Sequence, residues 1–378
     1  MKLLRKVFFY FKQFGISRTL SYVRANLHMY AYRDFKGHRW INPNCRDKDD
    51  RERIVAIIGS GRFAFSTIAY FLKKNSKNFL RYVYSPGRKK AVSLCKSFNG
   101  LCVPSDWTDI LKDDKVKIVF ILSPYETHAY YAIECINAGK HVYIEKPPVI
   151  SEDQLERLKQ SMIKNPQCKV FLGFNRSSSE NFVELKKQLT NESGSLTADC
   201  YMLVNKSKKN HTIINSDQAI LEHVCHLTDL ILRLVPQDKS HLYAIKDQEI
   251  SASEDELELS FSVRFGDQSK VCFHYKEIQD FHEGMEEVLE IKKGNLKAYL
   301  INFQELRIVK HEKKVTRRTK FRDHGHNINI QNAYLSALGG AGSGEDIEHI
   351  ESSSKLYLKI MESMREISND NDTFHSKI

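Results

Sequence analysis

The amino-acid sequence predicts an α/β protein with more than one domain. Its 378 residues are too many for one ordinary domain. Strand-like and helix-like segments alternate between residues 53 and 150, which is the rhythm of a parallel sheet covered by helices. A glycine-rich turn joins the first strand of that stretch to its first helix. Apolar residues make up 41% of the chain and charged residues 28%, so we expect a sizeable core and exclude global disorder.

The first strand and its turn predict a dinucleotide-binding Rossmann domain. Residues 54–58 form a short β-branched run that leads directly into Gly59-Ser60-Gly61-Arg62-Phe63-Ala64, and a helix-forming stretch follows over residues 65–74. Glycine is needed in such a turn because the backbone must bend tightly and approach a pyrophosphate at the helix N-terminus. The candidate cofactor-binding residues of this turn are Gly59, Ser60, Gly61, Arg62 and Phe63.

The second strand, residues 79–84, bears on the choice of cofactor. It ends at Ser85, and Arg88 follows three residues later. A NAD site usually has an acidic residue at this strand end, whereas serine and arginine suit the 2′-phosphate of NADP. The alternative is that Arg88 belongs to the solvated first turn of the next helix. We therefore predict NAD(P) as the cofactor, with a preference for NADP.

Two later strands end in further candidate site residues. The strand over 116–122 stops at Ser123-Pro124, and the strand over 141–144 delivers Glu145 and Lys146. Ligands of an open α/β sheet bind off the carboxyl ends of its strands. We therefore expect these residues to share one edge of the sheet with Ser85.

A basic N-terminal arm, residues 1–52, holds most of the net charge of +11. Residues 1–53 contain thirteen Lys and Arg against five Asp and Glu, so an evenly basic nucleic-acid groove is not expected. No apolar run is long enough to predict a transmembrane helix, and a secretory signal is disfavoured. Phe8, Phe11 and Phe14 recur at helical spacing. The arm is either a helix docked on the protein's own body or an amphipathic helix in peripheral contact with a membrane.

The remaining boundaries and the cysteines complete the predicted organisation. We place the Rossmann domain at residues 53–150, a substrate and oligomerisation domain at 151–368, and a frayed tail at 369–378. The arm precedes the first strand of the Rossmann domain, so we expect cofactor binding to survive its deletion. The eight scattered cysteines contain no CxxC pair, which predicts reduced thiols, no metal site and a cytoplasmic location.

The segment from Gln218 to Val235 predicts a helix with two faces. One face carries an apolar stripe at helical spacing. The other carries Glu222, His226, Asp229 and Arg233, which fall within about 60° of each other on an ideal helix. Residue spacing alone leaves open whether this polar face is solvated or part of a site.

Several motifs together resemble the glucose–fructose oxidoreductase, inositol dehydrogenase and MocA (Gfo/Idh/MocA) family. The resemblance covers about residues 53–365. It is closest to the branch found with bacterial surface-polysaccharide biosynthesis. The motifs that carry it are Gly59 to Ala64, Ser123-Pro124 with His128, AGKHVYIEKP (138–147), GFNR (173–176), CHLTD (225–229) and DHGH (323–326).

The resemblance implies a fold, a site and an activity. It implies a Rossmann domain followed by an α/β domain with a mainly antiparallel sheet, with the nicotinamide at the domain junction beside Lys146. It implies Ser123, Pro124, His128 and Glu145 as cofactor-binding residues, and Lys146, His226 and Glu222 as catalytic residues. The activity would be hydride transfer at a sugar carbinol or ketone, the sugar being nucleotide-linked or phosphorylated and used in glycan biosynthesis. Homo-oligomers, dimers or tetramers built through the second domain's sheet, are also implied.

The sequence departs from the family pattern at the approach to His226. Ser216-Asp217-Gln218-Ala219 replaces a glycine-rich stretch, and His223 stands where a glutamate is usual. The loop with Asn205-Lys206-Ser207-Lys208-Lys209 and His211 could contact a phosphorylated sugar or be a solvated basic loop. The family includes a repressor that binds the cofactor without turnover. A non-catalytic cofactor-binding sensor or assembly protein is therefore the alternative to an oxidoreductase.

Overall fold

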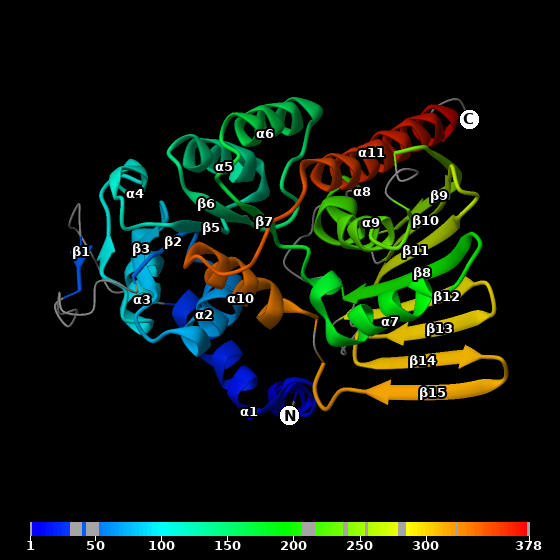
Figure 1. Cartoon of the computed structure of the whole chain (residues 1–378), viewed down its shortest axis with the longest axis horizontal. Coiled ribbons are helices and arrows are strands. Elements are labelled where there is room, and N and C mark those ends of the chain that lie inside the picture. The colour runs from blue at the N-terminus through cyan, green and yellow to red at the C-terminus, as the bar shows by residue number, and fades with distance from the viewer. Residues whose placement is uncertain are drawn as a thin grey trace. The chain divides into compact units, whose positions relative to one another are not determined.

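The computed structural model divides the chain into two compact units (Figure 1). The parallel-sheet unit consists of Phe14–Gly173 and His326–Glu351, and the antiparallel-sheet unit of Met1–Gln13, Phe174–Gly325 and Ser352–Ile378. These units divide the chain differently from the boundaries predicted at residues 53, 151 and 369, which stay predictions. The residues that the structure describes are 2–30, 40–42, 53–205, 216–236, 241–253, 256–278, 285–322 and 324–375.

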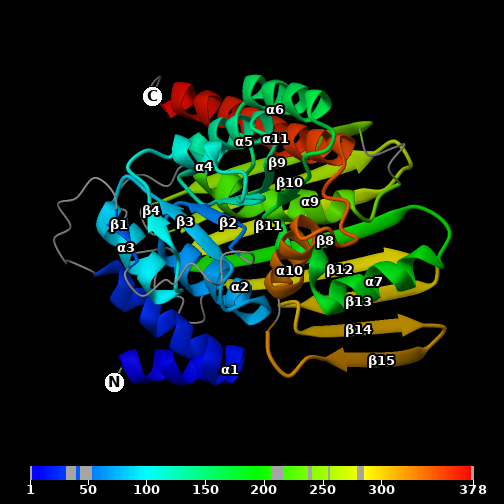
Figure 2. The ribbon, with the colours of Figure 1, turned by 60° about the vertical axis from the view of Figure 1, so that its left-hand side comes forward.

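The parallel-sheet unit is built on a sheet whose strand order, in the described residues, is β1-β4-β3-β2-β5-β6-β7. Figure 2 shows the part of this sheet formed by β1 to β4. All neighbouring strands are parallel except β1, which runs antiparallel to β4. The strand order reverses between β2 and β5, as in a doubly wound dinucleotide-binding sheet. The Rossmann prediction is therefore confirmed. The strands are β1 (Trp40–Ile41), β2 (Val55–Ile58), β3 (Leu80–Tyr84), β4 (Cys102–Val103), β5 (Ile118–Ile121), β6 (His141–Ile144) and β7 (Val170–Leu172).

Helices complete the core of this unit, and one of them comes from late in the sequence. Helix α10 packs on α2 and contributes Ile330, Ala333 and Tyr334 to the core beside β2 and β3. Sequence periodicity did not predict this long-range return. The helical segments are η2 (Ala64–Ile68), α2 (Ala69–Asn75), α3 (Arg88–Ser97), α4 (Thr108–Lys112), η3 (Tyr125–Thr127), α5 (His128–Asn137), α6 (Glu152–Lys164) and α10 (His326–Ala337).

The antiparallel-sheet unit holds a sheet in the order β15-β14-β13-β12-β8-β11-β10-β9. Among these strands the β8–β11 pair alone is parallel, so the prediction of a mainly antiparallel sheet is confirmed. In β10 alternate positions face the core and bury Leu257, Leu259 and Phe261. The strands are β8 (Leu196–Asn205), β9 (Tyr243–Ala252), β10 (Glu256–Phe265), β11 (Lys270–Ile278), β12 (Met285–Lys293), β13 (Leu296–Ile301), β14 (Glu305–Lys310) and β15 (Lys313–Arg318).

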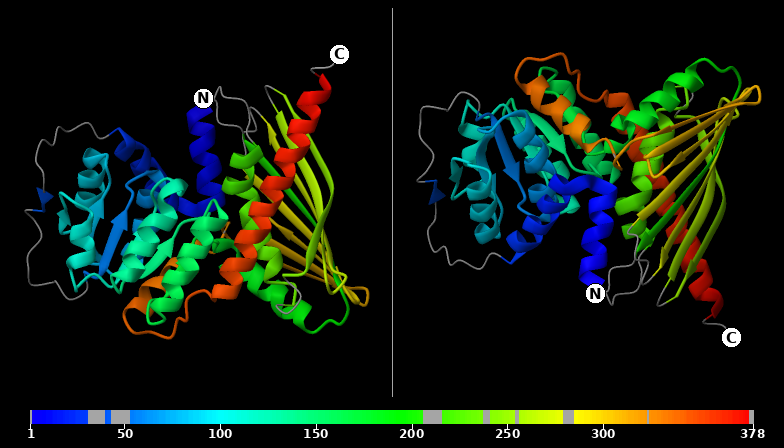
Figure 3. Two further views of the ribbon diagram at one scale, coloured as in Figure 1. Left: turned by 90° about the horizontal axis from the view of Figure 1, so that it is seen from above. Right: turned by 90° about the horizontal axis from the view of Figure 1, so that it is seen from below.

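Helices of this unit cover one face of its sheet, as α9 and the C-terminal part of α11 show in Figure 3. The long N-terminal helix α1 (Lys2–Met29) is kinked at Gly15, whose φ is 77°. No helix among the described residues is long and apolar enough to cross a lipid bilayer. The other helical segments are η4 (Asn175–Ser178), α7 (Glu180–Thr190), α8 (Ser216–Ala219), η5 (Ile220–Val224), α9 (Cys225–Leu232) and α11 (Ile347–His375).

A buried charge network joins two of the sequence motifs within the antiparallel-sheet unit. Glu287 on β12 is fully buried, and its Oε1 accepts a 2.6 Å hydrogen bond from Arg176 Nε of the GFNR motif. Its Oε2 lies 3.7 Å from Arg322 Nη2 and 3.6 Å from His324 Nε2 of the DHGH motif. Asn175 also donates to the His324 carbonyl. The two motifs therefore hold each other in place.

Gly325, at the centre of the second motif, is required by the same packing. Its φ is 80°, and an added Cβ would collide with the Asn175 carbonyl and lie 2.6 Å from the Ser179 nitrogen. A side chain here would push residues 324–325 away from the segment that contains the first motif. Asp323, the first residue of the second motif, lies outside the described residues.

Replacing the buried carboxylate should destabilise the protein strongly. Glu287→Gln leaves two guanidinium groups without their buried counter-charge, and breaking such a pair typically costs 3–5 kcal/mol. We expect the free energy of unfolding to fall by about 3 kcal/mol in denaturant titrations. Glu290→Gln, on the same strand, removes a carboxylate that pairs with Lys297 at the surface and should cost less than about 1 kcal/mol. Equal losses for the two variants would contradict a structural role for the network.

Candidate functional site

The turn after β2 places two backbones in close contact. Gly59 has a φ of 105°, and its N–H donates to the Tyr84 carbonyl at 2.8 Å. An added Cβ would collide with the Leu122 carbonyl and lie 2.8 Å from the Ser123 nitrogen. Glycine is therefore the residue that fits where the chain leaves β2 beside the end of β5. This is the point at which the strand order reverses and at which open α/β sheets bind ligands.

The rest of the turn fits a dinucleotide. Apart from Gly61 and its neighbours in the chain, no atom of the described residues lies within 4 Å of a Cβ built on Gly61, so a phosphate could approach the backbone there. Ser60 is buried, and its Oγ has no hydrogen-bond partner among the described residues. Arg62 is exposed, and the Phe63 ring meets the His326 ring edge to face at 5.6 Å. An open backbone beside a buried hydroxyl suits a phosphate, which accepts hydrogen bonds from both.

The helix that begins at this turn contains a π-helical segment, η2. Side chains of the N-terminal arm donate hydrogen bonds to this segment. Arg18 of α1 donates through Nη1 to the Ser66 carbonyl and through Nη2 to Thr67 Oγ1 at 2.9 Å. Ser21 Oγ donates to the same carbonyl at 3.2 Å. The guanidinium carbon of Arg18 lies 4.6–5.1 Å from the ring centroids of Tyr22, Tyr70 and Phe71. π-helical segments recur at functional sites, and Arg18 stabilises this one from outside the helix.

A second residue of the arm contacts the glycine turn itself. The buried ring of His28 lies 2.8 Å from the Ser60 carbonyl through Nε2 and 2.9 Å from Ser93 Oγ through Nδ1. A neutral ring satisfies both contacts, because Nε2–H donates to the carbonyl and Nδ1 accepts from the hydroxyl. Residues 14–29 are thus packed into the parallel-sheet unit. The structure does not support the expectation that the whole arm is dispensable for cofactor binding.

The end of β3 carries the residues predicted to select the cofactor. Ser85 follows the strand directly, and α3 begins at Arg88. The Arg88 guanidinium donates through Nη1 to the Pro104 carbonyl at 3.0 Å. The side chain is therefore only partly exposed and anchored to the loop after β4, which differs from the freely solvated helix turn considered above.

His128 joins the loops that follow β5 and β6. Its Nδ1 lies 2.9 Å from the Pro147 carbonyl and its Nε2 lies 2.8 Å from the Ser123 carbonyl. Burial lowers the pKa of this ring. Thr127 Oγ1 donates at 2.7 Å to the Pro124 carbonyl and also lies 2.7 Å from Ser123 Oγ. His128 thus holds two strand-end loops together, which positions their side chains.

The Glu145-Lys146-Pro147 segment follows β6 at the same edge of the sheet. Because β3, β5 and β6 are parallel to β2 in one sheet, the residues after their carboxyl ends share one edge, as predicted. Lys146 is partly exposed there. The Glu145 carboxylate packs so closely on Gly173 that a Cβ on that glycine would lie 2.5 Å from Oε2.

In the antiparallel-sheet unit, the predicted helix contains His226 and Asp229, and both are buried. The π-helical segment η5 directly precedes α9, on which these residues lie. The His226 ring meets the Phe174 ring of the GFNR motif edge to face at 5.8 Å. Asp229 accepts two hydrogen bonds from Arg233, at 3.1 and 3.0 Å. The solvated-face alternative is therefore wrong for His226 and Asp229.

Glu222 lies in η5 and is more exposed than His226. Its Oε1 accepts a 2.8 Å hydrogen bond from Gln218, and its Oε2 lies 4.0 Å from His223 Nε2. The His223 ring stacks on Tyr275 with centroids 5.8 Å apart. Burial, together with Glu277, raises the pKa of Tyr275. This arrangement of Tyr275 beside the helix was not predicted, because β11 comes about fifty residues later in the chain.

The sequence contains two further basic segments, residues 205–211 and 310–322. One alternative for the basic loop over residues 205–211 is contact with a phosphorylated sugar. Asn205 ends β8, and residues 206–211 lie outside the described residues. The basic run from Lys310 to Arg322 contains the turn of the β14–β15 hairpin and the whole of β15. Within the described ranges no group of three or more His, Cys, Asp or Glu is arranged to hold a metal ion.

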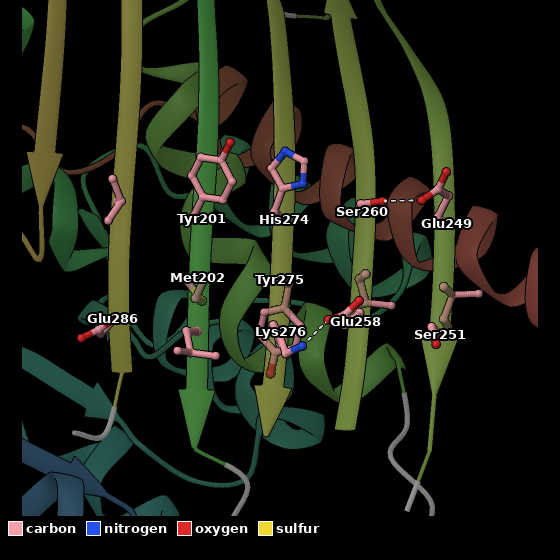
Figure 4. Close-up of a pocket in the computed structure, with 14 residues that line it drawn as sticks. Tyr201, Met202, Glu249, Ser251, Glu258, Ser260, His274, Tyr275, Lys276 and Glu286 are labelled. Atoms are coloured by element: carbon pink, nitrogen blue, oxygen red, sulfur yellow. Dashed lines mark hydrogen bonds and ion pairs between the residues drawn. The ribbon is translucent and has the colours of Figure 1, made fainter. Parts of the chain in front are cut away.

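The outer face of the antiparallel sheet is hollowed into a pocket of about 640 Å³ (Figure 4). Tyr201 on β8 and His274 on β11 stack there with centroids 4.7 Å apart. Ser260 and Glu249 hydrogen-bond across β10 and β9 at 3.4 Å. Its lining mixes these polar side chains with apolar ones such as Met202, Ile250 and Val288.

Comparisons with known proteins agree with this geometry. Residues 53–174 match the model of an oxidoreductase family with a NAD-binding Rossmann fold. Inositol 2-dehydrogenase of Salmonella typhimurium is 28% identical over 137 residues, which are 35% of this chain and 40% of that relative. The chain thus spans about 40% of the length of the curated relatives it matches.

Solved structures share the fold over most of the chain. A dehydrogenase from Chromobacterium violaceum has a TM-score of 0.73 at 13% identity, covering 85% of this chain and 98% of that one. A UDP-N-acetylglucosamine 3-dehydrogenase from Acidithiobacillus ferrooxidans has a TM-score of 0.67 at 14% identity, covering 81% and 96%. At these identities the likeness shows the fold.

Two glycine substitutions should separate the stability of the turn from its binding function. Gly59→Ala forces a Cβ against the Leu122 carbonyl, so we expect a Tm lowered by several degrees and loss of cofactor binding. Gly61→Ala places a methyl group in open space, so its Tm should stay near wild type while cofactor affinity falls at least tenfold. Thermal unfolding and titration with NADH and NADPH measure both. A Gly61→Ala protein with unchanged affinity would contradict phosphate binding at this turn.

Two of the buried histidines, His28 and His128, predict a pH dependence. Burial lowers the pKa of His28 and His128 below the ordinary value of 6.5, so the unfolded chain binds protons more readily than the folded one. Their contribution to stability is complete above about pH 6.5 and is lost as the pH falls below it. We expect the Tm to fall between pH 6.5 and 5, and to fall less in His28→Gln. Identical slopes for wild type and variant would contradict a neutral buried His28.

Proposed function

We propose that this chain is an NAD(P)-dependent oxidoreductase of the Gfo/Idh/MocA family that acts on a sugar alcohol or ketone group. Residues 53–174 match the model of that oxidoreductase family. The observation that carries the proposal is the glycine turn at the switch point of the sheet, with Lys146 at the carboxyl end of β6 on the same edge. A dinucleotide site beside an ionisable side chain provides what a hydride-transfer reaction requires of the protein.

We assign the cofactor to the residues after β2, β3, β5 and β6. The backbone at Gly61 and the Ser60 hydroxyl would hold the pyrophosphate, and Ser85 and Arg88 would lie toward the adenosine ribose. Ser85 in place of an acidic residue supports NADP over NAD, because an acidic residue would repel a 2′-phosphate. A bound nicotinamide would supply or accept the hydride. Side chains of the protein would accept or donate the proton of the reacting hydroxyl group.

Lys146, His226 and Glu222 are the proposed catalytic residues. Oxidation of a carbinol requires a base for the hydroxyl proton, and reduction requires an acid at the same oxygen. We assign that proton to Lys146, and the hydrogen bond to the substrate oxygen to His226. Burial of His226 against Phe174 supports this role, because a packed ring is held in one orientation. Glu222 would orient this pair or balance its charge.

A nucleotide-linked or phosphorylated sugar of glycan biosynthesis is the proposed substrate. The fold shared with a UDP-N-acetylglucosamine 3-dehydrogenase supports the same class without identifying the sugar. We also propose a homo-oligomer that uses the outer face of the antiparallel sheet, where Tyr201 is exposed and stacks with His274.

The first experiment identifies the nucleotide released from the denatured, purified protein by mass spectrometry. Titration with NADH and NADPH and a turnover screen of nucleotide sugars follow. Tight binding with turnover supports the oxidoreductase. The absence of binding to either cofactor contradicts the proposal.

A cofactor-binding sensor is the second candidate function. The observation that favours it is His223, which takes the place of an expected glutamate and stacks on Tyr275. A protein that binds NADH or NADPH tightly but turns over none of the sugars would support this alternative.

Lys146→Ala should separate catalysis from cofactor binding. We expect kcat to fall at least a hundredfold, because the reacting oxygen loses its proton carrier, while the cofactor Kd changes less than threefold. Lys164→Ala, an exposed lysine at the end of α6, is the matched control and should keep wild-type kcat. Equal turnover in Lys146→Ala and wild type would remove Lys146 from the mechanism.

A further inference from the structure

The second half of α1 has an apolar outer face. Ile16, Leu20, Val23, Leu27 and Tyr30 recur at helical spacing and are 40–69% exposed. On an ideal helix these positions fall within a sector of about 80°. Isolated exposed apolar side chains are ordinary, but five in one continuous row are not. We call this row the arm stripe.

The opposite face of the same helix is polar and buried. It carries Arg18, Thr19, Ser21 and His28, with Ala25 in the core. Arg18, Ser21 and His28 contact backbone carbonyls of the turn and of η2. A helix that only covers its own domain buries apolar residues and exposes polar ones. In α1 this order is reversed, so the arm stripe is left for a second contact.

The charges around the arm stripe indicate the kind of partner. The first 33 residues contain seven Lys and Arg and no Asp or Glu. A groove of about 630 Å³ borders the stripe, and its lining includes Leu20 and Leu27 together with Arg24 and Lys73. Arg24 and Lys73 are exposed. An apolar row flanked by cations fits a surface that offers anionic groups above a hydrocarbon layer.

We propose that the second half of α1, residues 16–29, together with Tyr30 directly after it, is a membrane-surface helix that attaches this protein peripherally to anionic lipid. The helix lies in the interface, with the arm stripe toward the acyl chains and with Arg24 and Lys73 toward lipid phosphates. Tyr30 is suited to the headgroup level, where its ring is apolar and its hydroxyl wet. A second copy of the chain fits less well, because the first 33 residues of each copy carry cations and no acidic residue and would repel each other. The proposal does not depend on the activity.

Vesicle flotation of the full-length protein tests it. Wild type should bind phosphatidylcholine vesicles containing about 30% phosphatidylglycerol at least tenfold more tightly than pure phosphatidylcholine vesicles, and high salt should weaken this binding. Leu20→Ser/Leu27→Ser should lose at least tenfold in binding to the anionic vesicles. Arg24→Glu/Lys73→Glu should lose the preference for them. Ile163→Ser/Val183→Ser changes two exposed apolar residues elsewhere and should bind like wild type.

The opposing outcomes are equally specific. Each variant should keep the wild-type Tm, because the substituted side chains are exposed. Wild type that fails to bind anionic vesicles, or a Leu20→Ser/Leu27→Ser protein that binds as wild type does, overturns the proposal. Equal binding to both kinds of vesicle overturns its electrostatic part. A smaller oligomer for Leu20→Ser/Leu27→Ser in light scattering, without vesicle binding by wild type, would assign the arm stripe to self-association instead.

Discussion

The contact between Gly59 and the carbonyl of Leu122 determines where the parallel-sheet unit can bind a ligand. On one side Gly59 bonds to the end of β3, and on the other its Cα lies against the end of β5. A side chain at this position would push β2 and β5 apart. Because the strand order reverses between these two strands, their loops turn away from each other beyond the contact. The open backbone at Gly61 and the buried hydroxyl of Ser60 follow from that divergence.

The arm extends this constraint to the N-terminal end of the chain. Arg18 fills the π-helical segment after the turn, and His28 bonds to the Ser60 carbonyl. The Ser60 and Ser66 carbonyls thus receive hydrogen bonds from the polar face of α1, and the apolar face of the same helix is exposed. Helix α1 therefore contacts the glycine turn with one face and carries the arm stripe, the proposed lipid-binding surface, on the other. Its two faces differ in polarity because docking to backbone carbonyls needs polar side chains.

The antiparallel-sheet unit shows that a family motif can mark packing as well as chemistry. Arg176 and His324 lie in two such motifs, and both meet the buried Glu287. Gly325 lets the second motif approach the first. Phe174, in the first motif, packs on His226. The charge network therefore anchors the motif whose Phe174 packs on the proposed substrate-binding histidine, through residues that have no assigned part in the reaction.

The sequence by itself determined the elements whose signal is local. Buried parallel strands are continuous β-branched runs, so β2, β3, β5 and β6 were predicted, and the GxGxxA spacing located the turn between two of them. It also placed Lys146 at the correct sheet edge, because the end of a parallel strand fixes that edge.

Only the tertiary structure decided which face of each amphipathic helix is buried. Periodicity defines two faces of α1 and α9 but not the partner of either face, and that partner is supplied by η2, by Phe174 and by strands distant in sequence. The π-helical segments and the return of α10 to the core have the same cause, since both depend on contacts that no local pattern records.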